Sequence, residues 1–224
     1  TFNGDGGPSQ GSYTDHTLEL GIGRLTAKTK EEAKNMVDKI IRYKTAKQTL
    51  GTWKQKVAYL ADDGDRNEHM RQAEHFSSIL DEDFFDYSAK KLYLDRYNQD
   101  VDPGPNSPVT KDVTNTIKDG VFMFNYMGHG NEFQLTSLNE LAIDQDVIRN
   151  LSNRHKLPLF VTATCEFGKY DNPLRESGAE LLLSHDNGGA IALLTTTRAV
   201  YAHTNEPVNV ALHENLFTKT NGRY

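Results

Sequence analysis

The sequence predicts an α/β protein built on a mostly parallel sheet with helices on both faces. Two short apolar runs, residues 121–127 and 157–165, are rich in β-prone side chains, which is typical of buried parallel strands. Glycine or polar residues follow each run, and a segment with helical spacing of apolar residues comes next. This alternation of strand and helix continues along the chain, as a parallel sheet with crossover helices requires.

The first half of the chain begins with a Gly-, Ser- and Asp-rich stretch, residues 1–17, which we expect to be a loop or linker. Thr29 and Glu32 form a pattern like a capping box, and apolar residues at helical spacing follow them. The other elements expected in this half are strands over 18–25, 53–60 and 90–94 and a helix over 66–80.

The second half continues the alternation after a Pro-, Gly- and Asn-rich loop at 102–108. The expected elements are helices over 110–118, 137–151, 177–184 and 206–217 and strands over 121–127, 157–165 and 190–196. Residues 218–224 are expected to be a tail, so that one domain spans 18–217.

The composition limits the possible classes of protein. The 224 residues, 37% of them hydrophobic, suffice for one large domain or a domain with an incomplete second one. A net charge of −6 without a basic cluster argues against nucleic acid as a main partner. One cysteine excludes an intrachain disulfide, and no apolar run is long enough to span a membrane. The start at Thr1, without an initiator Met or signal peptide, suggests a piece of a larger protein.

The residues best suited to chemistry follow the two apolar runs. Cys165 ends one run, and His129 follows the other between Gly128 and Gly130. Ligands bind outside the carboxyl ends of strands in an open α/β sheet, so we expect Cys165 and His129 side by side at that edge. A cysteine nucleophile needs such a basic neighbour. The alternatives are a buried core cysteine and a structural histidine.

Oriented amides and a third residue would complete this pair. The N–H groups of Gly130 and Cys165 could form an oxyanion hole. Asp62, Asp63 and Asp65 end another expected strand at the same edge. We expect Asp63 to orient the imidazole and Asp65 to cap the next helix, while a calcium site is an alternative use of the cluster.

Several further residues are candidates for substrate contact. Glu132 and Glu166 flank the Cys-His pair, and Thr197 and Tyr201 follow the next strand, where they would line one wall of the cleft. No metal site is predicted, because neither an HExxH nor a CxxC motif occurs. The remaining histidines show no metal-ligand spacing with the cysteine; they are His16, His69, His75, His155, His185, His203 and His213.

Two motifs carry a resemblance to a known family. The segments Asn-Tyr-Met-Gly-His-Gly-Asn-Glu at 125–132 and Thr-Ala-Thr-Cys-Glu-Phe-Gly at 162–168 resemble those of the gingipain family of cysteine peptidases. The resemblance extends over roughly 18–217 and implies a caspase-like, three-layer α/β fold. It also implies that His129 is the catalytic histidine, Cys165 the nucleophile and Gly130 the oxyanion-hole glycine, with the acidic third residue at Asp63.

The resemblance also suggests a role within the family. Segments 21–33 and 62–65 look most like the peptidase of the type IX secretion system, a sortase-like enzyme. That likeness implies removal of C-terminal signal domains from secreted cargo at the outer membrane or cell surface of a Gram-negative bacterium. It implies transfer of the new carboxyl end to an anionic lipopolysaccharide and contact with other secretion components. No cofactor is required, although family members can bind calcium.

Substrate selection can also be compared with the family. Tyr201 falls near the aromatic wall of the family's specificity pocket. The acid by which the digestive members select Arg or Lys would fall near residues 66–68, where this chain has no Asp. This difference favours a sorting enzyme over a degradative one.

Two other classes of protein compete with the peptidase. A non-catalytic caspase-like scaffold or docking domain would share the fold, but a retired site usually loses one residue of the pair. A flavodoxin-like binding domain would need a phosphate loop, and Gly21-Ile-Gly23 alone is a weak match to one.

Overall fold

The computed structural model describes residues 21–97, 106–136 and 143–218. Its centre is a five-stranded, all-parallel sheet with the strand order β2-β1-β3-β4-β5. The strands are β1 (Lys56–Ala61), β2 (Ser88–Tyr93), β3 (Met123–Met127), β4 (Leu159–Ala163) and β5 (Ala192–Thr195). The helices are α1 (Lys30–Thr45), α2 (Gly64–Asp83), α3 (Pro108–Asp119), α4 (Gln145–Arg149), α5 (Gly178–Ser184) and α6 (Ala202–Leu216). Short 3-10 turns lie at Lys47–Thr49, Thr52–Gln55 and Leu94–Arg96.

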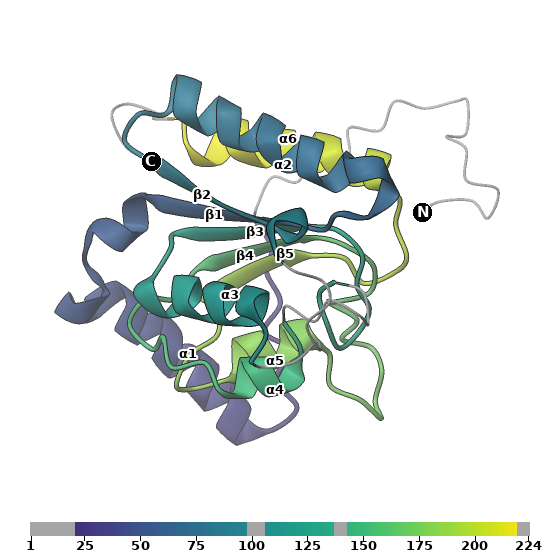
Figure 1. The fold of residues 1–224 in the computed structure, drawn as a ribbon. Coiled ribbons are helices and arrows are strands. Elements are labelled where there is room, and N and C mark those ends of the chain that lie inside the picture. Colours follow the sequence, from purple (N-terminus) through teal and green to yellow (C-terminus); the bar gives the residue numbers. More distant parts are fainter. Residues whose placement is uncertain (1–20, 98–105, 137–142, 219–224) are drawn as a thin grey trace, which may run out of the picture.

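Helices cover both faces of the sheet, so the molecule has three layers. Helices α2 and α6 lie together on one face, and α1, α3, α4 and α5 lie on the other (Figure 1). Two separate apolar cores fill the spaces between the layers. This arrangement confirms the predicted α/β fold with a parallel sheet between helices.

The central strands supply both cores, because successive side chains of a strand point to opposite faces. In β1, Ala58 and Leu60 join the core beneath α3, α4 and α5, whereas Val57 and Tyr59 join the core beneath α2 and α6. Burial on both faces accounts for the continuous apolar runs in the sequence.

Several element boundaries differ from the expectations. The strand expected over 53–60 begins only at Lys56, after a 3-10 turn that buries Trp53. Of the strand expected over 18–25, residues 21–25 have no regular structure, and 18–20 lie outside the described residues. The linker 1–17 and residues 219–224 of the tail also lie outside them.

The helix expected over 137–151 is shorter, since only α4 forms in the described part. Asp144 caps that helix, its side chain accepting from the N–H of Val147 at 2.7 Å. Just before it, Ile143 pairs with Leu135 in an antiparallel bridge. Residues 137–142 lie outside the described residues. Within the described ranges, no helix is long and apolar enough to cross a membrane.

A buried lysine joins α1 to the far end of α5. The Nζ of Lys39, a residue only 2% exposed, lies 2.9 Å from the carbonyl oxygens of Leu183 and Gly188. The carbonyl oxygens of Leu182 and Ala190 lie 3.2 and 3.4 Å from the same atom. These carbonyls end a helix and begin a turn, where they have no intrahelical partners. The amino group of Lys39 therefore supplies this turn with donors in addition to the N–H of Ala190, which donates to the carbonyl oxygen of Leu182 at 3.0 Å.

A second buried polar group, His213 of α6, packs against α2 and β1. Its ring stacks on Tyr59 and Phe76, Nδ1 lies 2.8 Å from the carbonyl oxygen of Asn209, and Nε2 lies 3.0 Å from the Tyr59 hydroxyl. A neutral ring that donates from Nδ1 and accepts at Nε2 satisfies both contacts. Burial lowers the pKa of His213 below its ordinary value of 6.5.

We expect Lys39→Met to lower the free energy of unfolding by about 2–4 kcal/mol, because it leaves several buried carbonyl oxygens without a donor. Urea denaturation of the variant and of Lys30→Met, a matched change at an exposed position of α1, measures the effect. The control should stay within about 0.5 kcal/mol of the parent protein. A similarly small loss for Lys39→Met would show that its donors are dispensable.

Stability should decrease as the pH falls below about 6.5, in part because of His213. Its pKa is lower in the folded than in the unfolded state, so the unfolded chain binds more protons in this range. Replacement by Phe keeps a ring in the stack and removes the titrating group. The free energy of unfolding of His213→Phe should therefore decrease less than that of the parent between pH 6.5 and the folded-state pKa. Parallel pH profiles would contradict this account.

Candidate active site

The site is built at the carboxyl edge of the three central strands. In their shared register, Met127 of β3 pairs with Ala61 of β1 on one side and with Ala163 of β4 on the other. His129 and Cys165 each lie two residues beyond this last row of pairs, and Asp63 does so on β1. Parallel pairing thus brings these three segments to one edge, as the sequence predicted.

The turn after β3 holds the backbone of His129 on both sides. Its N–H donates to Oδ2 of Asp62 at 3.1 Å, and its carbonyl oxygen accepts from the Tyr126 hydroxyl and from the N–H of Thr136. A side chain at Gly128 would clash with the Tyr126 hydroxyl and would lie 2.5 Å from Cβ of Asp62. Glycine is therefore required at 128 by close packing of the two strand ends.

The buried carboxylate of Asp62 connects this turn to the start of α2. Asp62 is 2% exposed, and its second oxygen, Oδ1, accepts from the N–H of Gly64 at 3.2 Å. A buried carboxylate needs such donors to offset its lost hydration. The role of Asp62 in the structure is thus to hold backbone rather than to face the imidazole ring.

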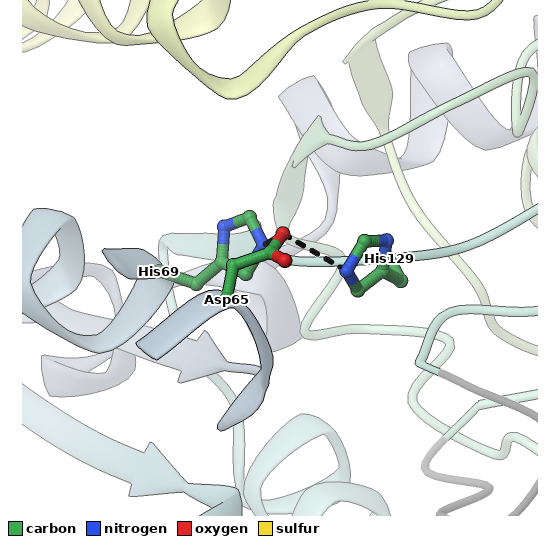
Figure 2. A group of neighbouring side chains, drawn as sticks. All are labelled: Asp65, His69 and His129. Atoms are coloured by element: carbon green, nitrogen blue, oxygen red, sulfur yellow. Dashed lines mark ion pairs between the residues drawn. The ribbon is translucent and has the colours of Figure 1, made fainter. Parts of the chain in front are cut away.

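The carboxylate that lies against the imidazole belongs to Asp65. Its Oδ2 is 3.1 Å from Nε2 of His129 and 3.4 Å from Nε2 of His69, so it lies between two rings (Figure 2). The rings of His69 and His129 are arranged edge to face, with centroids 5.4 Å apart. Asp63, which we expected to orient the imidazole, occupies the N-cap position of α2, and its orienting role stays a prediction.

The backbone conformation explains the direction of Asp65. Asp65, Arg66 and Asn67 all have positive φ angles, 52°, 57° and 62°, at the start of α2. Left-handed backbone is unfavourable for residues other than glycine, and Asp and Asn tolerate it best. The expectation that Asp65 caps the helix is wrong, because Asp63 takes the cap position and the turn directs Asp65 toward His129.

The nucleophile candidate lies where β4 leaves the sheet. Cys165 is half-buried, and its Sγ lies 3.5 Å from both the N and the O of Val200. The next residue, Glu166, has a φ of 53°, and its N–H donates to the carbonyl oxygen of Arg198 at 3.3 Å. The segment after β5 therefore packs directly on the cysteine, as expected for one wall of the site.

Gly130 lies beside the residue that precedes Cys165. A Cβ at Gly130 would lie 2.6 Å from Oγ1 of Thr164, so the two strand ends touch at this point. Gly130 also forms an antiparallel bridge with Leu135. Two hydrogen bonds flank that bridge. The N–H of Thr136 donates to the carbonyl oxygen of His129 at 2.9 Å, and the N–H of Asn131 donates to that of Gln134 at 3.0 Å. In this kind of pair, the N–H of Gly130 points away from Leu135.

The flanking acids have local partners. Glu132 is buried, and its Oε1 accepts from Nδ2 of Asn172 at 2.9 Å, which joins two loops at the edge of the site. Glu166 is partly exposed and forms an ion pair of 3.0 Å with Lys169.

The other two candidate contact residues lie on the segment after β5. Thr197 is half-buried, and Tyr201 is 74% exposed at the start of α6. Both therefore lie on the segment that packs against Cys165, and Tyr201 presents much of its ring to solvent.

Sequence reasoning missed His69. One signal was the spacing of four residues from Asp65 to His69, which places two side chains on one face of a regular helix. The positive φ angles at 65–67 depart from that geometry, so the contact also depends on the turn. Its proximity to His129, 60 residues later, depends on how β1 and β3 pair. Among the described residues, the side chains that could hold a metal ion together are Asp65, His69 and His129. Two nitrogen ligands do not suit calcium, which prefers oxygen.

Curated relatives agree with the expected family. Gingipain R2 and Gingipain R1 from Porphyromonas gingivalis are each 24% identical to this chain over 191 residues, which is 82% of the chain. The match covers 24% of the length of Gingipain R2 and 18% of that of Gingipain R1. The chain thus spans about a quarter or less of these relatives.

Solved structures share the fold of this chain, and a family model matches nearly its whole length. The complex of Porphyromonas gingivalis RgpB pro- and mature domains has a TM-score of 0.72 at 21% identity, over 90% of this chain and 46% of that one. The Arg-specific cysteine proteinase gingipain R (RgpB) has a TM-score of 0.65 at 20% identity, over 89% and 46%. The family model Peptidase family C25 matches residues 2–224. The chain therefore belongs to peptidase family C25.

Proposed function

We propose that this chain carries the catalytic centre of a cysteine endopeptidase, with Cys165 as nucleophile and His129 as base. The observation that carries the proposal is the shared register of β3 and β4, which brings both residues two positions beyond paired strand ends. Membership of peptidase family C25 supports the reaction class. The glycines around His129 and the tight turn at Glu166 allow both side chains to leave the sheet at its edge.

The position of Asp65 assigns the roles of the two imidazole nitrogens. A carboxylate 3.1 Å from Nε2 of His129 favours the tautomer that carries its proton on Nε2. The lone pair is then on Nδ1, which is the atom that takes the thiol proton of Cys165. We therefore assign the orienting role to Asp65 in place of Asp63.

The reaction begins when the Cys165 thiolate attacks the scissile carbonyl carbon and the carbonyl oxygen becomes an oxyanion. The N–H groups of Gly130 and Cys165 are the proposed donors to that oxygen. His129 then gives its proton to the leaving amine as the C–N bond breaks, and an acyl-enzyme thioester remains. Water or a second amine attacks the thioester and restores the thiol. No step requires a cofactor.

The substrate class follows from the likeness to the sortase-like members. We propose that the enzyme removes C-terminal signal domains from type IX secreted cargo at the outer membrane or cell surface. The acceptor for the new carboxyl end would be an amine of an anionic lipopolysaccharide, and other secretion components would be its partners. Residues 66–68 include no Asp of the kind by which the digestive members select a basic side chain. Glu166, Thr197 and Tyr201 are the proposed contacts for substrate.

A non-catalytic scaffold with the same fold is the second candidate. The intact pair of Cys165 and His129 counts against it, as does the N–H of Val200 directed at the sulfur, which can hold negative charge there. Alkylation by iodoacetamide near neutral pH separates the two. An activated thiolate would react rapidly, whereas a scaffold cysteine would react at the rate of an ordinary thiol.

Cys165→Ala should abolish cleavage, with a loss of several orders of magnitude in rate. The measurement is intact-mass analysis of a cargo protein with its C-terminal signal domain, incubated with the full-length enzyme or with the variant. An added amine on the new carboxyl end indicates transpeptidation, and addition of water alone indicates hydrolysis. Full cleavage by the variant would remove Cys165 from the mechanism.

Asp65→Asn should lower kcat by about 10- to 10⁴-fold, because an amide at this position no longer favours the proton on Nε2 of His129. The matched variant is Asp63→Asn, two residues earlier, for which we expect a smaller loss. Steady-state kinetics on one peptide substrate compares them. The reverse order of losses would return the orienting role to Asp63.

A further inference from the structure

One group of side chains offers more than the proposed reaction needs. Asp65, His69 and His129 bring a carboxylate oxygen and two imidazole nitrogens within 4.8 Å of one another. Orienting His129 requires only Asp65. His69, from the second turn of α2, points its ring at the same carboxylate (Figure 2).

The distances suit a small tetrahedral cation. Zn²⁺ binds imidazole nitrogen and carboxylate oxygen at about 2.0–2.1 Å, so two ligands of a tetrahedral ion lie about 3.3 Å apart. The Oδ2 of Asp65 lies 3.1 Å from one Nε2 and 3.4 Å from the other. Both separations match the edge of such a tetrahedron.

His69 itself points to a ligand. It is 5% exposed, and within the described part of the chain its buried Nε2 has no hydrogen-bond partner. Although Oδ2 of Asp65 is 3.4 Å away, the two atoms do not form a hydrogen bond. A buried polar atom without a partner costs free energy, and a metal ion would satisfy it.

The other two side chains leave the group open on one side. The side chain of His129 is 56% exposed and that of Asp65 is 53% exposed, whereas that of His69 is 7% exposed. A cation could therefore enter from solvent and keep a water as its fourth ligand. Two imidazoles with one carboxylate favour Zn²⁺ and related transition metals over calcium or magnesium.

We propose that Asp65, His69 and His129 form a binding site for Zn²⁺ or a similar transition-metal ion, and that the bound ion inhibits the enzyme. Binding by the three side chains stands alone, whereas inhibition rests on the proposed function. A neutral His129 that gives its Nε2 lone pair to the metal must carry its proton on Nδ1. It can then no longer accept the thiol proton there, and Asp65 is withdrawn from its orienting role.

Metal binding is measured first on the full-length Cys165→Ala protein, so that the result does not depend on catalysis. Calorimetric titration with ZnCl₂ should show one ion per chain. His69→Gln should weaken binding by on the order of 100-fold or more, since losing a second-shell partner of a ligand already costs 10–100-fold. His75→Gln, at an exposed position of α2, should bind like the parent. Equal affinity in all three proteins would overturn the site.

Co²⁺ absorption of the Cys165-containing protein tests for a competing site. A sulfur-to-cobalt charge-transfer band that persists in His69→Gln would mean that Cys165 and His129 hold the metal instead, which contradicts the proposal. The inhibition arm compares peptidase activity with Zn²⁺ and after chelation in the parent and His69→Gln. Each assay is normalised to the same variant without metal. Inhibition should shift to higher Zn²⁺ concentration in His69→Gln, and an unchanged curve would overturn the inhibitory role.

Discussion

The two hydrogen bonds that the buried carboxylate of Asp62 accepts are the interactions on which the candidate site depends. One oxygen holds the N–H of His129 and the other holds the N–H of Gly64, so the ends of β3 and β1 and the start of α2 share one anchor. Charge-assisted hydrogen bonds of this kind contribute about 1.5–3 kcal/mol each. Their geometric effect matters more here, because Asp65 follows directly from Gly64. The same carboxylate therefore sets the position of the imidazole and of the acid that contacts it.

The edge itself was predictable from the sequence, and the reason is physical. Strands buried on both faces must be apolar throughout, so 121–127 and 157–165 stand out as runs, and parallel pairing brings their carboxyl ends together. The same rule explains why Cys165 and His129 were predicted to be neighbours. Caps were also local: Thr29 accepts from the N–H of Glu32 at 3.1 Å, and Ser177 with Glu180 forms a full capping box.

The sequence could not assign separate roles to the three aspartates at positions 62–65. Asp62, Asp63 and Asp65 are chemically alike, and their roles are separated only by the path of the backbone. Residues 65–67 are three successive non-glycine residues with positive φ, a conformation that propensity does not predict. Tertiary contacts override propensity here and change the direction of the Asp65 side chain. The short α4 has a similar origin, since the bridge to Leu135 uses Ile143, a residue that periodicity assigned to a helix.

The distance between a carboxylate and an imidazole that suits catalysis also suits two ligands of one metal ion. A carboxylate that polarises an imidazole lies about 3 Å from its nitrogen, which is close to the edge of a zinc tetrahedron. Proximity of Asp65 and His129 alone therefore cannot distinguish catalysis from metal binding. His69 makes the difference, because a third ligand is superfluous for proton transfer and because its buried Nε2 has no hydrogen-bond partner among the described residues, which is unfavourable. The buried ring of His69 is stabilised most when a cation is bound. Metal binding would therefore stabilise this part of the fold while it inhibits catalysis.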